Sequence, residues 1–107
     1  MHQSALTCLN GRFIPSSEAM LPIADRGFRF GDGVFETIRL DAGVPYQWDM
    51  HVSRLEAGLA ALRITLPKVD WQETARTLMK KNKTTEGYLR IAVSRGVGSR
   101  GYLPDSG

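Results

Sequence analysis

A glycine-rich stretch that leads directly into an alternating segment, residues 25–39, constrains the fold of this 107-residue chain more than any other feature. Its three glycines allow backbone conformations with positive φ and let the backbone approach a ligand closely. The alternation that follows predicts a strand with Phe35 and Arg39 on one face and Glu36 and Ile38 on the other. A turn that gathers guanidinium groups and aromatic rings suits an anionic, partly aromatic ligand.

Turn signals divide much of the remaining chain into short antiparallel pairs. Asn10-Gly11 lies between two short apolar runs and predicts a β-hairpin over residues 5–14. The turn at residues 41–43 is expected to join a strand at 34–40 to a hairpin partner at 44–48. These connections favour antiparallel pairing, because parallel strands need a longer crossover.

The last predicted strand covers residues 87–95 and has one continuous aliphatic face. That face consists of Leu89, Ile91 and Val93. Tyr88 and Arg90 fall on the opposite face. A charge in such a strand is costly unless it is paired or faces a cleft. Arg90 is therefore expected either to pair with a glutamate such as Glu36 or to line a cleft.

Two amphipathic segments predict helices. Asp49 can cap a helix that runs through Ile64 and ends before Pro67. Asp70 and Glu73 have capping-box spacing and open a second helix, whose lysine-rich end suits the carbonyl-rich C-terminus. Strands in pairs with helices between them predict an α+β fold, a mainly antiparallel sheet packed with two helices.

Composition argues against several classes of function. The net charge of +3, from 14 basic and 11 acidic residues, is mild and spread along the chain, so it does not indicate a nucleic-acid partner. The two histidines lack the clustered companions of a metal site, and no metal is predicted. No apolar run approaches transmembrane length, so no membrane association is predicted. One cysteine, Cys8, cannot form an internal disulfide, which is typical of the reducing cytoplasm.

Three segments, residues 25–39, 51–55 and 88–102, resemble the class IV aminotransferases, the fold-type IV pyridoxal-phosphate (PLP) enzymes. The second reads His51-Val52-Ser53-Arg54-Leu55, and the third contains Arg95-Gly96-Val97-Gly98-Ser99-Arg100-Gly101. The segments follow the family's order and approximate spacing, and together they cover nearly the whole chain. The resemblance implies that residues 1–107 form the small N-terminal domain of a homodimer that uses PLP and small amino acid or 2-oxo acid substrates. The single cysteine and the absence of a signal pattern predict that the protein is cytoplasmic.

The resemblance also implies site residues. The arginine of the family's His-x-x-Arg-Leu element binds the PLP phosphate, and here that residue is Arg54. The alternative is a surface arginine without a partner. The implied substrate-binding residues are Phe30, Phe35, Tyr88, Arg90 and Arg100. The alternatives are core packing for the two phenylalanines, an ordinary half-buried strand position for Tyr88 and a solvated loop for Arg100.

One catalytic residue of the family has no counterpart in this sequence. Family members hold PLP as a Schiff base on a lysine of the large domain, and none of the four lysines here lies at a matching position. We expect that lysine, and with it the catalytic large domain, beyond Gly107. Residues 1–107 alone are expected to be inactive, either as a fragment of a longer enzyme or as a non-catalytic remnant.

Two enzymatic functions and one other class of function fit the resemblance. A PLP-dependent aminotransferase would move an amino group between an amino acid and a 2-oxo acid. An aminodeoxychorismate lyase would convert aminodeoxychorismate to 4-aminobenzoate and pyruvate. Arg100 with Tyr102 favours the lyase, whereas Tyr88 and Arg90 favour the aminotransferase. The third possibility is a stand-alone binding module without chemistry.

Overall fold

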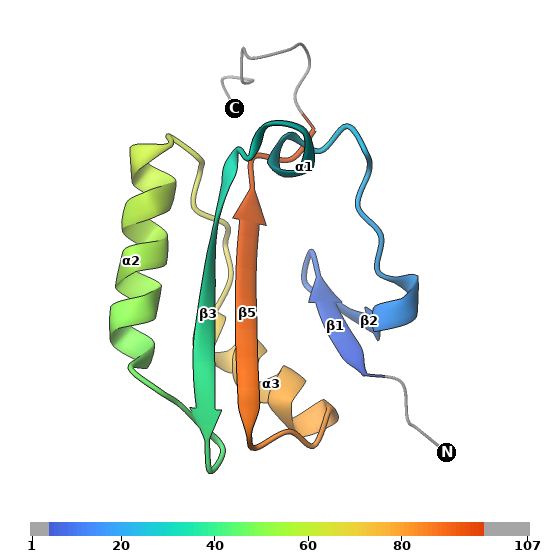
Figure 1. Cartoon of the computed structure of the whole chain (residues 1–107), viewed down its shortest axis with the longest axis vertical. Helices are drawn as coiled ribbons and strands as arrows, with labels where there is room; N and C mark the ends of the chain where they lie inside the picture. The colour runs from blue at the N-terminus through green and yellow to red at the C-terminus, as the bar shows by residue number, and fades with distance from the viewer. Residues whose placement is uncertain (1–4, 98–107) are drawn as a thin grey trace.

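The computed structural model describes residues 5–97. Within that range the chain forms two antiparallel sheets and three α-helices (Figure 1). The elements in chain order are β1 (Leu6–Leu9), β2 (Arg12–Pro15), the 3₁₀ turn η1 (Ser16–Glu18), α1 (Arg26–Phe30), β3 (Gly33–Asp41), β4 (Val44–Pro45), α2 (Trp48–Ala61), α3 (Trp71–Lys81) and β5 (Gly87–Ser94). β1 pairs with β2, and the second sheet has the order β4-β3-β5. The predicted α+β fold is confirmed, with a short third helix in addition to the two predicted.

β3 and β5 form the centre of the larger sheet, and their side chains alternate as predicted. The strands pair over eight positions, from Gly33 opposite Ser94 to Leu40 opposite Gly87. The buried positions of one face are Glu36, Ile38, Leu40 and Leu89, and the exposed positions of the other are Phe35, Thr37, Arg39, Tyr88, Arg90 and Ala92. We call the second set the open face of the sheet.

Both long helices cover the buried face. α3 packs on Ile38 and Leu89 through Ala75, and partly buried side chains of α3 complete this cluster. α2 contributes Leu55 and Leu59 to a second cluster, against which side chains of β3 and β5 pack. In Figure 1, α2 flanks β3 and α3 passes behind the two strands, so the viewer looks onto the open face.

α2 lies very close to β3 because residue 58 has no side chain. A Cβ atom on Gly58 would lie 3.1 Å from both γ-methyl groups of Val34, which is tighter than an ordinary van der Waals contact. A larger residue there would force the helix or the strand to shift. Gly58 therefore sets the distance between this helix and the sheet.

The start of α2 differs from the prediction. The expected hairpin partner at 44–48 is only two residues long, Val44–Pro45, because Gln47 adopts a positive φ of 53° and turns the chain into the helix. α2 begins at Trp48, and Asp49 lies inside its first turn instead of capping it. The Asp49 carboxylate still suits the positive end of the helix dipole there.

The end of α2 also differs. The helix ends at Ala61 and not at Ile64, because Arg63 takes a left-handed conformation with φ of 56°. The reversal carries Ile64 back onto the core beside Leu55. Ile64, predicted as the last residue of the helix, is therefore a core residue that lies outside it.

The glycine-rich turn contains a short helix, α1, that the sequence pattern did not predict. The Asp25 carboxylate accepts a hydrogen bond from the Gly27 amide at 2.8 Å and caps the helix. Gly31 then ends it in a left-handed conformation, with φ of 65°. One turn bounded by glycine is too short for a helical periodicity to be recognised in the sequence.

The predicted cap of α3 and the predicted N-terminal hairpin are both confirmed. Asp70 accepts a hydrogen bond from the Glu73 amide at 3.0 Å. The hairpin is joined to the rest of the fold through Asn82, just after α3, whose side-chain amide donates to the Leu6 carbonyl at 2.9 Å and accepts from the Leu6 amide at 2.7 Å.

We predict that Ile91→Ala in the full-length protein lowers the free energy of unfolding by about 2–5 kcal/mol, because Ile91 packs against both core clusters. Thr37→Ala, on the open face of the neighbouring strand, is the matched control and should change stability by about 0.5 kcal/mol or less. Urea denaturation measures both. Equal effects of the two substitutions would contradict the assignment of faces.

Candidate functional site

Arg54, the predicted phosphate ligand, is held by a buried carboxylate on β3. Its Nε donates to Glu36 Oε2 at 3.0 Å and its Nη2 donates to Oε1 at 2.7 Å. The Glu36 side chain is 6% exposed, whereas that of Arg54 is 63% exposed. The alternative of a surface arginine without a partner is therefore wrong. One edge of the guanidinium is anchored, and much of the group remains open to solvent.

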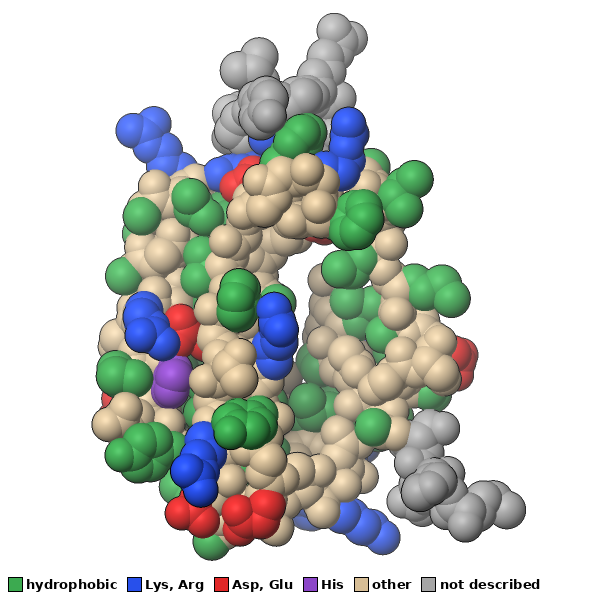
Figure 2. Space-filling view, viewed as in Figure 1, with side chains coloured by type: hydrophobic (Ala, Val, Ile, Leu, Met, Phe, Trp, Pro, Cys, Tyr) green, Lys and Arg blue, Asp and Glu red, His purple; other side chains and the backbone are tan. Residues whose placement is uncertain are grey.

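His51 binds the same carboxylate from the preceding turn of α2. Its Nδ1 lies 2.7 Å from Glu36 Oε1, and its side chain is 11% exposed. We call Glu36, His51 and Arg54 the Glu36 cluster. Figure 2 shows basic, acidic and histidine side chains close together on the α2 side of the molecule.

The charges of this cluster reinforce one another. The Arg54 guanidinium holds the pKa of the Glu36 carboxyl below its ordinary value of 4.5, burial acts in the opposite direction, and the hydrogen bond with His51 adds to the lowering. The carboxylate in turn raises the pKa of Arg54. Glu36 and Arg54 therefore remain an ion pair at neutral pH.

Three of the predicted substrate-binding residues lie together on the open face of the sheet. The guanidinium carbon of Arg90 lies 4.4 Å from the centre of the Phe35 ring, within cation–π range. Tyr88 lies on the same face, two residues before Arg90 on β5. Phe35 and Tyr88 are 58% and 73% exposed, so neither is a core residue. The suggested pairing of Arg90 with Glu36 is wrong, because Glu36 faces α2 on the other side of the sheet.

The remaining predicted substrate-binding residues lie elsewhere. Phe30 lies in α1, at the end of the sheet and not on its face, and it is half-buried. Its ring centre is 4.9 Å from the guanidinium carbon of Arg26 and 5.0 Å from that of Arg29. Arg100 lies outside the described residues.

A second ionic cluster, which sequence reasoning missed, joins three elements at the end of β5. Asp32 accepts hydrogen bonds from Arg26 Nε at 3.0 Å and from Arg95 Nε at 2.6 Å. Arg95 also donates to the backbone carbonyls of Leu62 and Arg63, just beyond α2. α1, the end of α2 and the exit of β5 are thereby fixed to one carboxylate. Asp32 and Arg95 are 63 residues apart, a separation at which no spacing rule applies.

Glu36 and His51 were also missed as parts of the site. The resemblance implied only Arg54, and the alternation of β3 indicated only that Glu36 lies on the face opposite Phe35. A glutamate in the middle of an otherwise aliphatic face was the available signal, because a buried carboxylate requires a partner.

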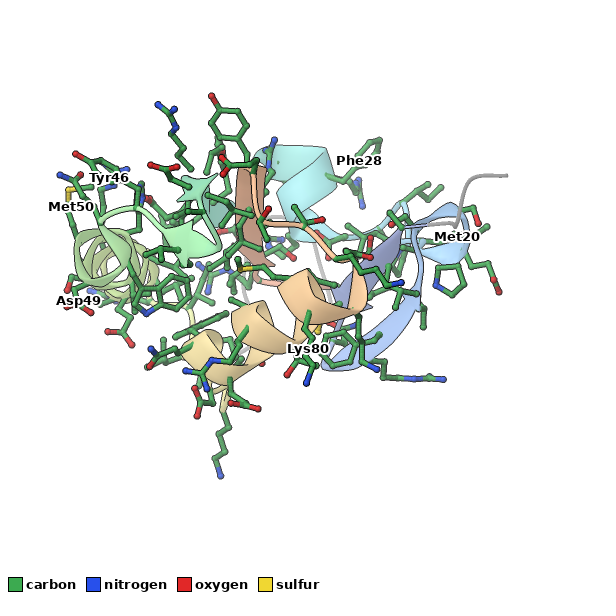
Figure 3. The ribbon with its side chains drawn as sticks, turned by 90° about the horizontal axis from the view of Figure 1, so that it is seen from below. Met20, Phe28, Tyr46, Asp49, Met50 and Lys80 are labelled. Carbon is green, nitrogen blue, oxygen red and sulfur yellow. The ribbon has the colours of Figure 1, made fainter. Side chains whose placement is uncertain are left out.

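A hollow of about 630 Å³ lies between β4, α3 and the start of α2, and no residue of the two ionic clusters lines it. It is lined by apolar side chains such as Trp48, Ala75 and Met79 and by basic ones such as Lys80. Figure 3 shows the two helices from this end, with Asp49 on α2 and Lys80 on α3. Of the predicted site residues that lie within residues 5–97, none lines this hollow.

Residues 5–97 contain neither a membrane-spanning helix nor a metal-binding cluster. No helix in that range has the length and apolar character needed to cross a membrane. The same residues contain no group of three or more His, Cys, Asp or Glu side chains that could hold a metal ion.

The fold is similar to part of a solved aminotransferase. A T.th. branched-chain amino acid aminotransferase, complexed with N-(5'-phosphopyridoxyl)-L-glutamate, matches with a TM-score of 0.84 at 25% identity. The match covers 97% of this chain and 37% of that one.

Sequence relatives agree with the structural match. Aminodeoxychorismate lyase of Bacillus subtilis (strain 168) is 37% identical over 99 residues, which cover 89% of this chain and 34% of the lyase. D-alanine aminotransferase of Bacillus licheniformis is 34% identical over 100 residues, 92% of this chain and 35% of that enzyme. The family model for amino-transferase class IV matches residues 33–107. The chain therefore belongs to the class IV aminotransferase family, and it spans about a third of the length of these curated relatives.

We predict that Asp32→Asn flattens the acid end of the stability profile. Arg95 and, secondarily, Arg26 hold the pKa of Asp32 below its ordinary value of 3.8. A lowered folded-state pKa means that the carboxylate stabilises the fold above about pH 4, and that this stabilisation is lost as the pH falls through the folded-state value.

The variant should be less stable by about 3 kcal/mol at neutral pH, because Arg26 is buried and loses its counter-charge. The difference from the native protein should shrink between about pH 5 and pH 2. Thermal melting across this range measures it, with Glu56→Gln on the exposed side of α2 as control. A difference that stays constant with pH would contradict the ionic role of Asp32.

Proposed function

We propose that residues 1–107 are the small N-terminal domain of a PLP-dependent aminotransferase that moves an amino group between an amino acid and a 2-oxo acid. The observation that carries this proposal is Arg54, anchored on one edge by a buried glutamate and open on the other, at the position where the family's signature has its phosphate-binding arginine. The proposal is supported by the PLP derivative in the matched branched-chain aminotransferase.

The donor set of Arg54 fits a phosphate group. A guanidinium has five N–H donors, and Glu36 engages one on Nε and one on Nη2, which leaves three donors on Nη1 and Nη2. Those donors form a planar fork that binds phosphate oxygens in pairs. No other partner of Arg54 is found among residues 5–97.

The open face of the sheet would supply one wall of a substrate pocket. Phe35 and Tyr88 offer flat apolar surface, and Arg90 offers a cation whose stacking on Phe35 restricts its motion. A carboxylate of an amino acid or 2-oxo acid would be a natural partner for that cation. When bound, PLP supplies the electron sink that amino-group transfer requires.

The catalytic lysine is proposed to lie outside residues 1–107. The lysines of the described part are Lys68, Lys80, Lys81 and Lys83, in α3 or beside it. α3 lies behind the sheet, opposite the open face. The domain proposal is tested by the intact mass of the natural gene product. A mass two to three times the 11.9 kDa of this chain is expected. A mass near 11.9 kDa would contradict the proposal and favour a stand-alone binding module.

A lyase is the second candidate, and the 37% identity to the Bacillus subtilis enzyme favours it. We predict that the full-length protein transfers an amino group from an amino acid to a 2-oxo acid, measured as formation of the new amino acid. The same preparation is offered aminodeoxychorismate. Release of pyruvate and 4-aminobenzoate, without transfer, would replace the aminotransferase by the lyase.

The proposal includes a cytoplasmic homodimer. Its support is a group of exposed apolar side chains before and within α1, including Ile23 at 81% and Phe28 at 74%. Met20 and Phe28 both lie on the side of the molecule away from α2 (Figure 3). Sedimentation of the full-length protein as a dimer is the expected result, and a fully active monomer would refute it.

We predict that Arg54→Ala in the full-length protein weakens PLP binding roughly 10- to 100-fold, the effect of losing charge-assisted hydrogen bonds to phosphate. Absorbance titration of the apo-protein measures it. Arg76→Ala is the matched control, because Arg76 is a similarly exposed helical arginine with a glutamate partner, Glu73, at 3.5 Å. Unchanged affinity in the Arg54 variant would remove the phosphate role.

A further inference from the structure

We propose that Glu36 is a positioning residue for the cofactor phosphate, which acts by fixing the orientation of the Arg54 guanidinium. The inference rests on the proposed role of Arg54, and it assigns a function to a side chain that would not itself touch the ligand. It arises from the geometry of the Glu36 cluster, in which a buried carboxylate binds the inner edge of an exposed cation.

The contacts of Glu36 define one guanidinium orientation. Oε2 accepts from Arg54 Nε at 3.0 Å, while Oε1 accepts from Nε at 3.1 Å and from Nη2 at 2.7 Å. Side-on binding of both oxygens fixes the plane of the group as well as its position. The three remaining N–H donors then lie on the part of the group that the carboxylate does not occupy.

The carboxylate is itself rigid. Glu36 lies in the middle of β3, opposite Ile91 on β5, between paired positions on both sides. His51 binds Oε1 at 2.7 Å and restricts the last torsion of the side chain. α2 is held against the sheet by Leu55, which follows Arg54 directly and is fully buried. The anchor and the helix that carries Arg54 are therefore both fixed.

Anchoring matters because a free arginine side chain has many conformations. A guanidinium that is already held loses less rotamer entropy on binding phosphate than a free one does. The opposing effect is the negative charge of Glu36, which repels a phosphate. Loss of the anchor would lower PLP affinity, whereas loss of the repelling charge would raise it. The direction of the change in PLP affinity on removal of the carboxylate therefore distinguishes the two effects.

The test uses the full-length apo-protein, titrated by absorbance with PLP and with pyridoxal, which lacks the phosphate. Glu36→Ala removes the anchor and the charge, whereas Glu36→Gln removes the charge and keeps one acceptor. We expect PLP affinity to fall about tenfold in Glu36→Ala and less in Glu36→Gln. Pyridoxal affinity should not change. Glu73→Gln, which alters the exposed Glu73–Arg76 pair, is the matched control.

A double-mutant cycle separates positioning from structural damage. If Glu36 acts through Arg54, Glu36→Ala should have no further effect on PLP affinity in an Arg54→Ala background. Thermal melting of each apo-variant identifies misfolded protein, and Glu36→Gln supplies the comparison if Glu36→Ala does not fold.

Each alternative outcome overturns the inference in an identifiable way. PLP affinity that is unchanged or increased in both Glu36 variants, while Arg54→Ala weakens it, removes the role of Glu36 and leaves the proposed function intact. If Glu36→Ala lowered PLP affinity equally in the native and the Arg54→Ala backgrounds, or lowered pyridoxal affinity as much as PLP affinity, the effect would be structural. An Arg54→Ala variant with native affinity removes the phosphate role of Arg54, and the role of Glu36 with it.

Discussion

β3 and β5 pair in one antiparallel register over eight positions, and the strand-borne side chains of the proposed site take their orientation from that pairing. A slip of one residue in either strand would reverse all its side chains. In the observed register Glu36 joins the aliphatic face and meets α2, while Phe35, Tyr88 and Arg90 face outward together. The register of β3 and β5 thus places Glu36, which anchors Arg54, on the face opposite the open face.

The two ionic clusters attach the helices to this pair of strands. One carboxylate, Glu36, binds the middle of α2, and another, Asp32, binds the chain just beyond the end of α2 through Arg95. Each carboxylate accepts from two cationic or ionisable side chains, and in each case an arginine is the largest cause of the lowered pKa. Apolar packing brings α2 onto the sheet, and the two carboxylates determine where along the strand it rests.

Local sequence rules predicted the elements whose causes are local. The alternation of β3 and β5, the Asn10-Gly11 hairpin and the Asp70 cap all depend on residues a few positions apart, and all are confirmed. The predicted bounds of α2 were wrong because Gln47 and Arg63 adopt left-handed conformations, which cannot be predicted from their residue types.

The residues of the candidate site also divide into those that local patterns predicted and those that they did not. Arg54 was predicted as a phosphate ligand from a five-residue motif, and the face shared by Tyr88 and Arg90 was predicted from alternation. The partners of Arg54 and Arg95 lie 18 and 63 residues away and come together only through tertiary structure. Charged residues in the interior signalled that partners must exist, but spacing could not identify them.

Gly58 has a consequence for how mutations affect this protein. Gly58 is not one of the predicted site residues, and its lack of a side chain lets α2 pack closely against Val34. Gly58 lies one helical turn beyond Arg54, so a methyl group added there would lift the same part of the helix that carries the guanidinium. The neighbouring atoms would have to move by a few tenths of an ångström, and the same shift would lengthen the hydrogen bonds between the guanidinium and Glu36. Under the proposed role of Arg54, inherited or engineered changes at Gly58 would therefore weaken cofactor binding in a protein that still folds.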